Sequence, residues 1–181
     1  MKNIKKLGAL LCSACLVVSG TTIPTMADSM KVVTLGADLT DAQKNTMMKY
    51  FNVSSDQVQI LTITNQDERD HLSAYVPIEQ IGTRTVSCAY VKPTTSGGIK
   101  VRTANLNWVT CNMIATSLST SGVKNCEVVA ACPFEVSGTG ALTGIQMAYE
   151  TATGEQLDST KKELATEEMV VTGNLADEVG K

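Results

Sequence analysis

Residues 127–145, EVVAACPFEVSGTGALTGI, contain the clearest folding unit in this chain. Residues 127–134 are almost continuously apolar, which is typical of a strand that is buried on both faces. Residues 136–140 supply the glycines and serine of a turn, and from Ala141 onward apolar residues recur at helical spacing. The unit therefore predicts a buried strand that leads through a tight turn into a helix packed on a sheet.

The amino-terminal half of the chain shows the same alternation of strands and helices. Residues 31–35 have a strand pattern, and Thr40 then begins a capping box of the form Thr-x-x-Gln. The helix that follows is expected to end at Asn52, because asparagine tolerates the left-handed closing conformation. Residues 58–64, VQILTIT, predict a central strand, and residues 65–68 supply a second cap signature with acids in the first turn.

The second half adds a hairpin and two more helices to this pattern. Residues 83–92 and 99–105 predict strands, and residues 93–98 between them, PTTSGG, are dense in turn formers, so we expect a hairpin with an exposed tip. A helix is predicted over residues 108–120, and the charged tail predicts another, broken at Gly173. Together the elements predict a single α+β domain with a mixed sheet of about five strands, including one hairpin, and helices packed on it.

The first 27 residues have the pattern of an export signal. Three lysines precede an apolar run at residues 7–18, and small residues precede a cleavage site after Ala27. The run is shorter than the roughly 20 apolar residues of a membrane-spanning helix, so an uncleaved anchor is the less favoured alternative. We therefore expect residues 1–27 to be a signal peptide and residues 28–181 to form one secreted, extracellular domain, free or retained at the cell envelope, without a transmembrane segment.

Charge is unevenly distributed along the chain. Residues 1–27 carry three lysines and no acid, so cleavage changes the formal charge from −3 to −6, which gives no overall attraction to polyanions. The seven aromatic residues of the chain are too few for a platform that stacks single-stranded nucleic acid, and no nucleic-acid partner is expected. Between Glu79 and Glu127, however, there are five basic residues and no acidic one. They are Arg84, Lys92, Lys100, Arg102 and Lys124.

Lys100 and Arg102 alternate with Ile99 and Val101, so they should lie on the outer face of the hairpin. One interpretation is a solvated face that protects a sheet edge from pairing. The other is a contact surface, including Arg84, for an anionic cell-wall polymer or for lipid headgroups.

The turn at Ser137, Thr139 and Gly140 is a second candidate for contact with an anion. It places backbone N–H groups at a helix start, where anions are readily bound. The alternative is a tight turn that lets the helix pack closely on the sheet. The turn lacks the glycine spacing of a dinucleotide fingerprint, because Gly144 comes one residue late, and no cofactor is expected.

His71 is the single histidine of the chain, with Asp67 and Glu68 four and three residues before it on one predicted helix. An acid–base pair or a metal site is conceivable there, but a polar helix produces such neighbours by chance, and no metal is expected. The chain has no Gly-x-Ser-x-Gly nucleophile motif, and the sequence identifies no catalytic residue. Paired carboxylates for hydrolysis remain the enzymatic alternative.

Four cysteines follow the predicted cleavage site, and an exported location permits disulfides among them. Three complete pairings are possible. Cys126 and Cys132 lie on one predicted strand about 20 Å apart, so they should not pair with each other. Two alternatives remain open: the cysteines are buried and unpaired, or they form one or two disulfides. The four are Cys88, Cys111, Cys126 and Cys132.

Several short motifs together resemble the YpuA-like secreted proteins of unknown function from Gram-positive bacteria. They are VTLG at residues 33–36, TNQDE at 64–68, IGTR at 81–84, NWVT at 107–110 and PFEVSGTGALTGI at 133–145. The resemblance implies an exported or envelope-associated protein and supplies no catalytic residues. Combined with the charge pattern, it leads us to expect a non-enzymatic protein that binds anionic envelope components through the basic hairpin. A carboxylate-dependent hydrolase of cell-wall material and a partner-assembly module are the alternatives.

Overall fold

A computed structural model describes residues 30–76 and 78–180 of the chain. The predicted export signal and its cleavage site lie outside the described residues. The described part contains no helix that combines the length and the apolar character needed to cross a membrane.

Five strands form one mixed sheet in the order β2-β1-β3-β5-β4. β1 is parallel to β2 and β4 is parallel to β5, whereas β3 runs antiparallel to both of its neighbours, β1 and β5. The predicted single α+β domain with a five-stranded mixed sheet is therefore confirmed. The strands are β1 (Val32–Gly36), β2 (Gln59–Ile63), β3 (Cys88–Pro93), β4 (Ile99–Leu106) and β5 (Cys126–Val136).

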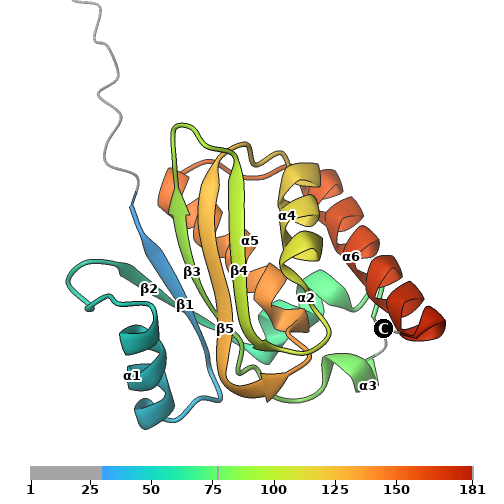
Figure 1. Cartoon of the computed structure of the whole chain (residues 1–181), viewed down its shortest axis with the longest axis horizontal. Helices are drawn as coiled ribbons and strands as arrows, with labels where there is room; N and C mark the ends of the chain where they lie inside the picture. Colours follow the sequence, from blue (N-terminus) through green and yellow to red (C-terminus); the bar gives the residue numbers. More distant parts are fainter. Residues whose placement is uncertain (1–29, 77, 181) are drawn as a thin grey trace, which may run out of the picture.

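The helices cover the two faces of the sheet unequally (Figure 1). A large core lies between one face and the helices α4, α5 and α6, whereas the smaller core on the other face is covered by the ten-residue helix α1. Part of that second face, over β3, β5 and β4, is consequently left open. The helices are α1 (Asp41–Tyr50), α2 (Asn65–Leu72), α3 (Ile78–Ile81), α4 (Cys111–Thr120), α5 (Thr139–Thr153) and α6 (Ser159–Val179).

Local capping signals are confirmed at both ends of α1. Thr40 and Gln43 form the reciprocal capping box, and Asn52 has a φ of 54°, the left-handed conformation expected just after the helix. A second capping box begins α2, where the side chain of Thr64 accepts from the backbone N–H of Asp67 and the Asp67 carboxylate binds the Thr64 backbone N–H at 2.7 Å. The helices that follow the parallel strands β1 and β2 therefore both begin at a position fixed by short-range hydrogen bonds.

The predicted hairpin is wrong, because β5 lies between β3 and β4. β5 is apolar on both faces and is buried in the sheet, whereas β4 exposes Lys100 and Arg102 and suits an edge. The loop between β3 and β4 crosses the start of β5. The N–H of Thr94 donates to the carbonyl of Asn125 at 3.2 Å, and the N–H of Gly98 donates to its side-chain oxygen at 2.9 Å.

Two further expectations are corrected. Residues 58–64 do not form a central strand: β2 is the edge, Ile60 is 40% exposed, and the fully buried strand is its neighbour β1. Helix α6 is continuous through Gly173. The glycine is there because the indole ring of Trp108 lies against it and leaves no room for a Cβ atom.

Candidate functional site

The open part of the second sheet face forms a basic groove between β3, β5, β4 and the carboxyl end of α1. The groove has a volume of about 960 Å³. Its floor follows from strand alternation, since residues i and i+2 of each strand share a face. Its lining includes Lys31, Tyr50, Phe51, Asn52, Val53, Tyr90, Arg102, Thr103, Glu127 and Val129, and Lys100 continues the same surface.

The sheet register places the groove's charges in a row across the strands. Glu127 of β5 lies opposite Lys92 of β3 on one side and opposite Lys100 of β4 on the other. Lys31 is next to Lys92, because β1 and β3 pair through Val32 and Val91. Neighbouring strands are about 4.8 Å apart, so Lys92 and Lys100 flank the carboxylate directly and Lys31 lies one strand further along the row.

The second row of the groove contains Tyr90, Val129 and Arg102, which are also register partners. Four positive side chains in the two rows therefore face a single negative one, Glu127. Lys92 Nζ and Glu127 Oε2 are 3.4 Å apart, but both side chains are about 40% exposed and solvent screens the pair. The surface keeps a local positive charge in an acidic protein.

Aromatic side chains form the wall of the groove at the end of α1. The left-handed conformation of Asn52 reverses the chain just after Phe51. The Phe51 ring then lies 6.3 Å from the Tyr90 ring and 5.8 Å from the Tyr50 ring, measured between centroids. Burial raises the pKa of Tyr90, although nearby Lys92 acts in the opposite direction, so its hydroxyl stays protonated at neutral pH. The groove combines cations with neutral rings.

The residues predicted to contact an anion lie in three places, of which only one is the basic groove. Lys100 and Arg102 lie together in the basic groove. Arg84 lies at the opposite end of the sheet, where its Nη2 is 3.5 Å from the carbonyl oxygen of Asp38, just beyond the end of β1. The turn from Ser137 to Gly140 follows the carboxyl end of β5 and is also remote from the groove.

The side-chain carboxyl group of Glu68 already lies at that turn. Gly138 has a φ of 88° and begins α5 without a side-chain cap, and the Glu68 carboxyl lies against Gly140 so closely that a Cβ atom would collide with it. A Cβ atom on Gly144 would lie 2.9 Å from Thr34 Oγ1 of β1. Close packing thus explains both glycines. Anion contact at Ser137, Thr139 and Gly140 stays a prediction, and such an anion would lie beside Glu68.

Glu68 is only 3% exposed. Burial raises its pKa from 4.5 to about 7; the Thr85 side chain lowers it, and the negative charges of Asp38 and Asp67 raise it further. This carboxyl group is therefore neutral under mildly acidic conditions and is poised to ionise near pH 7.

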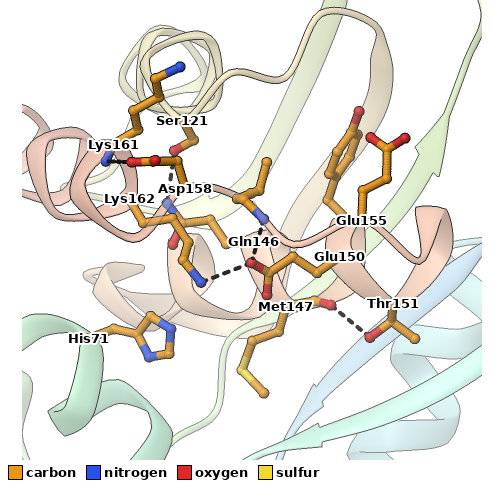
Figure 2. A network of polar contacts seen from close by, with 12 residues as sticks. His71, Ser121, Gln146, Met147, Glu150, Thr151, Glu155, Asp158, Lys161 and Lys162 are labelled. Carbon is orange, nitrogen blue, oxygen red and sulfur yellow. Dashed lines mark hydrogen bonds and ion pairs between the residues drawn. The ribbon is translucent and has the colours of Figure 1, made fainter.

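His71 is not joined to the two carboxylates with which helical spacing grouped it. Its Nδ1 lies 2.8 Å from the carbonyl oxygen of Asp67, while the Asp67 carboxylate caps α2 and Glu68 points into the core. The imidazole lies in a cavity of about 180 Å³ beside Lys162, which binds Glu150 at 2.9 Å (Figure 2). No group of three potential metal ligands occurs within residues 30–76 and 78–180.

The basic groove also contains residues that the sequence did not single out, namely Lys31, Tyr50, Phe51 and Tyr90. Strand alternation puts Lys31 on the same face as Val33, but only the pairing of β1 with β3 brings it beside the other lysines. Glu127 is the one acid among the described residues that line the groove. Glycoside hydrolysis needs two carboxyl groups about 5–9.5 Å apart, so the groove does not support the hydrolase alternative.

Comparison with known proteins identifies relatives without a known activity. The sequence profile of a family described as "Protein of unknown function (DUF1002)" matches residues 35–181. The uncharacterized protein YpuA of Bacillus subtilis (strain 168) is 39% identical over 150 residues, which is 82% of this chain and 51% of the relative. The chain thus spans about half the length of this curated relative. No solved structure matches the chain. These matches confirm the resemblance to YpuA-like proteins.

Proposed function

The chain belongs to the DUF1002 family of proteins of unknown function, and we propose that it binds an anionic, phosphate-rich polymer of the cell envelope in the basic groove. The observation that carries the proposal is the row of Lys31, Lys92 and Lys100 across adjacent strands, with Arg102 in the next row. The proposed location outside the membrane rests on the export-signal pattern of residues 1–27.

The arrangement of the charges suits a linear polyanion better than a single small anion. The row crosses four strands, and only Glu127 of β5 interrupts the lysines, so successive negative groups of a polymer crossing the strands could each lie near a cation. The exposed ring of Tyr50 and the half-buried rings of Phe51 and Tyr90 offer apolar contact to the carbon units between those groups. Nothing in this geometry requires a chemical reaction of the bound polymer.

A wall polymer is favoured over lipid headgroups as the source of the negative charge. The groove is bounded on one side by the end of α1 and is concave, whereas a protein that lies on a flat bilayer presents a protruding basic or apolar surface. Vesicles of anionic lipid therefore serve as the comparison ligand in the test.

We expect the double variant Lys100→Glu/Arg102→Glu to bind isolated anionic wall polymer with at least about tenfold lower affinity than the unaltered protein, because two attractive charges become repulsive. Binding of the unaltered protein should also weaken steeply between low and physiological salt, since the charges are exposed to solvent. Isothermal titration calorimetry or co-sedimentation with purified wall material measures both effects.

The matched control is Arg84→Glu/Lys161→Glu, which changes the net charge by the same amount at sites outside the groove. It should retain most of the affinity. Equal losses in both double variants would show that only the net charge matters, and salt-independent binding would contradict the proposal. Tighter binding to anionic vesicles than to wall polymer would show that lipid headgroups, and not the wall polymer, are the ligand.

Glu127→Gln should strengthen binding, because it removes the single negative charge from the centre of the row. We expect a two- to fivefold lower Kd, about 0.4–1 kcal/mol, measured at low salt in the same assay. Glu163→Gln on the exposed side of α6 removes an equal charge far from the groove and should leave Kd nearly unchanged. Weaker binding by Glu127→Gln would show that Glu127 orients the lysines or contacts the ligand.

A further inference from the structure

Two buried cysteines converge on one backbone carbonyl. The Sγ atom of Cys132 lies 3.3 Å from the carbonyl oxygen of Val86, and the Sγ atom of Cys88 lies 3.7 Å from the same oxygen. The two thiols are close enough for Cys132 to influence the pKa of Cys88. Both side chains are almost fully buried, at 0% and 2% exposure.

The two cysteines are neighbours on adjacent strands. Regular alternation would turn their side chains to opposite faces, but both sulfur atoms lie against the carbonyl oxygen of Val86, in the irregular segment just before β3. Cys88 of β3 lies directly opposite Ala131 of β5, so Cys132 is one residue further along the neighbouring strand. Disulfides join residues whose Cα atoms are usually about 4.4–6.8 Å apart, a range that includes close neighbours on adjacent antiparallel strands. We infer that Cys88 and Cys132 form a disulfide when the chain folds under oxidising conditions.

The other two cysteines occupy different environments. Cys126 packs in the core beneath α4, α5 and α6, six residues before Cys132 on the same strand. Cys111 is the first residue of α4 and lies 3.9 Å from the Asn112 side chain. Neither shares a contact with Cys88 or Cys132 among the described residues, so the three possible complete pairings reduce to one specific link.

The oxidation balances as a thiol–disulfide exchange with a small-molecule disulfide such as oxidised glutathione. One cysteine thiolate attacks the disulfide, forming a mixed disulfide and releasing one glutathione thiolate. The second cysteine thiolate then attacks the protein sulfur of the mixed disulfide and releases the second glutathione. Two protein thiols are oxidised, one glutathione disulfide is reduced, and the two cysteine protons pass to the leaving thiolates.

The timing of this step follows from burial. In the folded protein both thiols are closed to solvent, and burial raises the pKa of Cys88 to about 12, so thiolate is scarce there. Exchange is therefore expected while the chain is still open. Once folded, the link would tie β5 to the start of β3 and resist reduction.

The test refolds the full chain with oxidised glutathione, blocks free thiols with iodoacetamide in denaturant, and digests it with trypsin and a glutamate-specific protease. Cleavage after Arg84, Lys100, Lys124, Glu127 and Glu135 places Cys88, Cys111, Cys126 and Cys132 on separate fragments. The fragment that begins at residue 85 extends to Lys100, because Lys92 precedes a proline and resists trypsin. The expected major product is the fragment 85–100 linked to the fragment 128–135. Fragment 85–100 recovered only in alkylated form, or linked to Cys111 or Cys126, would overturn the inference.

A stability measurement distinguishes a native link from an incidental one. The oxidised chain should unfold at least about 5 °C above the chain kept in dithiothreitol, because the bond restricts the unfolded chain. Cys88→Ser should abolish this difference, whereas Cys111→Ser should retain it. An oxidised chain that is less stable than the reduced one would show that the strands cannot accommodate the bond.

Discussion

Replacing Gly36 with alanine is expected to lower the free energy of unfolding by about 3 kcal/mol or more. Gly36 ends β1 and is buried. A Cβ atom there would lie 2.6 Å from the carbonyl carbon of Thr85 and 2.6 Å from the Cα of Val86, both of which are backbone atoms. Backbone cannot rotate away as a side chain can, so β1 and the segment before β3 would have to separate.

The separation would break specific hydrogen bonds. The N–H of Asp38 donates to the carbonyl of Thr85 at 3.0 Å, and the N–H of Thr85 donates to the Asp38 carboxylate at 2.7 Å. These reciprocal bonds join the end of β1 to the approach to β3. Their loss adds to the steric cost, and buried groups left without partners cost about 1–3 kcal/mol each.

Chemical denaturation followed by circular dichroism measures the effect. Gly154→Ala is the matched control, because Gly154 has a φ of 72° and open space around it, so alanine there meets backbone strain without a collision. It should cost about 1 kcal/mol. If Gly36→Ala costs no more than Gly154→Ala, the contact between β1 and the segment before β3 is looser than the structure indicates.

The elements that could be predicted from the sequence are those whose cause is local. Thr40 and Gln43 form their capping box within one helical turn, and Asn52 closes the same helix by its own backbone conformation. The position of β5 is different in kind. β3 and β4 are close in sequence with a good turn between them, but the more apolar β5 competes for the place between them, and local patterns contain no information on that competition.

The candidate site shows the same division. Alternation placed Lys100 and Arg102 on one exposed face, and the structure agrees. Lys31 and Tyr90 join them only through strand pairings between distant segments. Arg84 is close to these residues in sequence but lies at the other end of the sheet. It precedes β3, which starts beside the carboxyl end of β1, runs antiparallel to it and reaches the groove only at its own carboxyl end.

Helical spacing alone also misled the grouping of Asp67, Glu68 and His71. The three residues are neighbours on α2, yet each makes a different contact: Asp67 with Thr64, Glu68 with α5, and His71 with a backbone carbonyl. Which of two adjacent acids points inward depends on where α5 packs, and Gly140 is what allows Glu68 to be that residue.

The buried position of Glu68 leads to a second large expected effect: the unaltered protein should lose stability as pH rises from about 4.5 to above 7. In the unfolded chain the carboxyl ionises near its ordinary pKa of 4.5, whereas in the folded chain burial raises the pKa to about 7. Below pH 4.5 both states hold the proton and the contribution is fully present. Between the two values only the folded state holds it, so the advantage falls with pH and is lost above about pH 7.

Glu68→Gln should remove this dependence, because glutamine keeps the shape and stays neutral. Near pH 8 the variant is expected to be more stable than the unaltered protein by about 1–3 kcal/mol, with little difference near pH 4.5. Urea denaturation at several pH values measures both curves, and their difference isolates Glu68 from every other titrating group. Glu163→Gln, an exposed carboxyl on α6, should follow the unaltered protein at each pH.

The sign of the difference near pH 8 separates two roles for the carboxyl group. If Glu68 is a buried acid held neutral against Gly140, its ionisation opposes folding and glutamine is stabilising. If the charged form of Glu68 is instead stabilised in the folded protein, for example by the partial positive charge at the start of α5, glutamine is destabilising near pH 8 and the stability of the unaltered protein rises with pH. Because Asp38 and Asp67 add negative charge around Glu68 and burial is the largest cause of the raised pKa, we expect the first result.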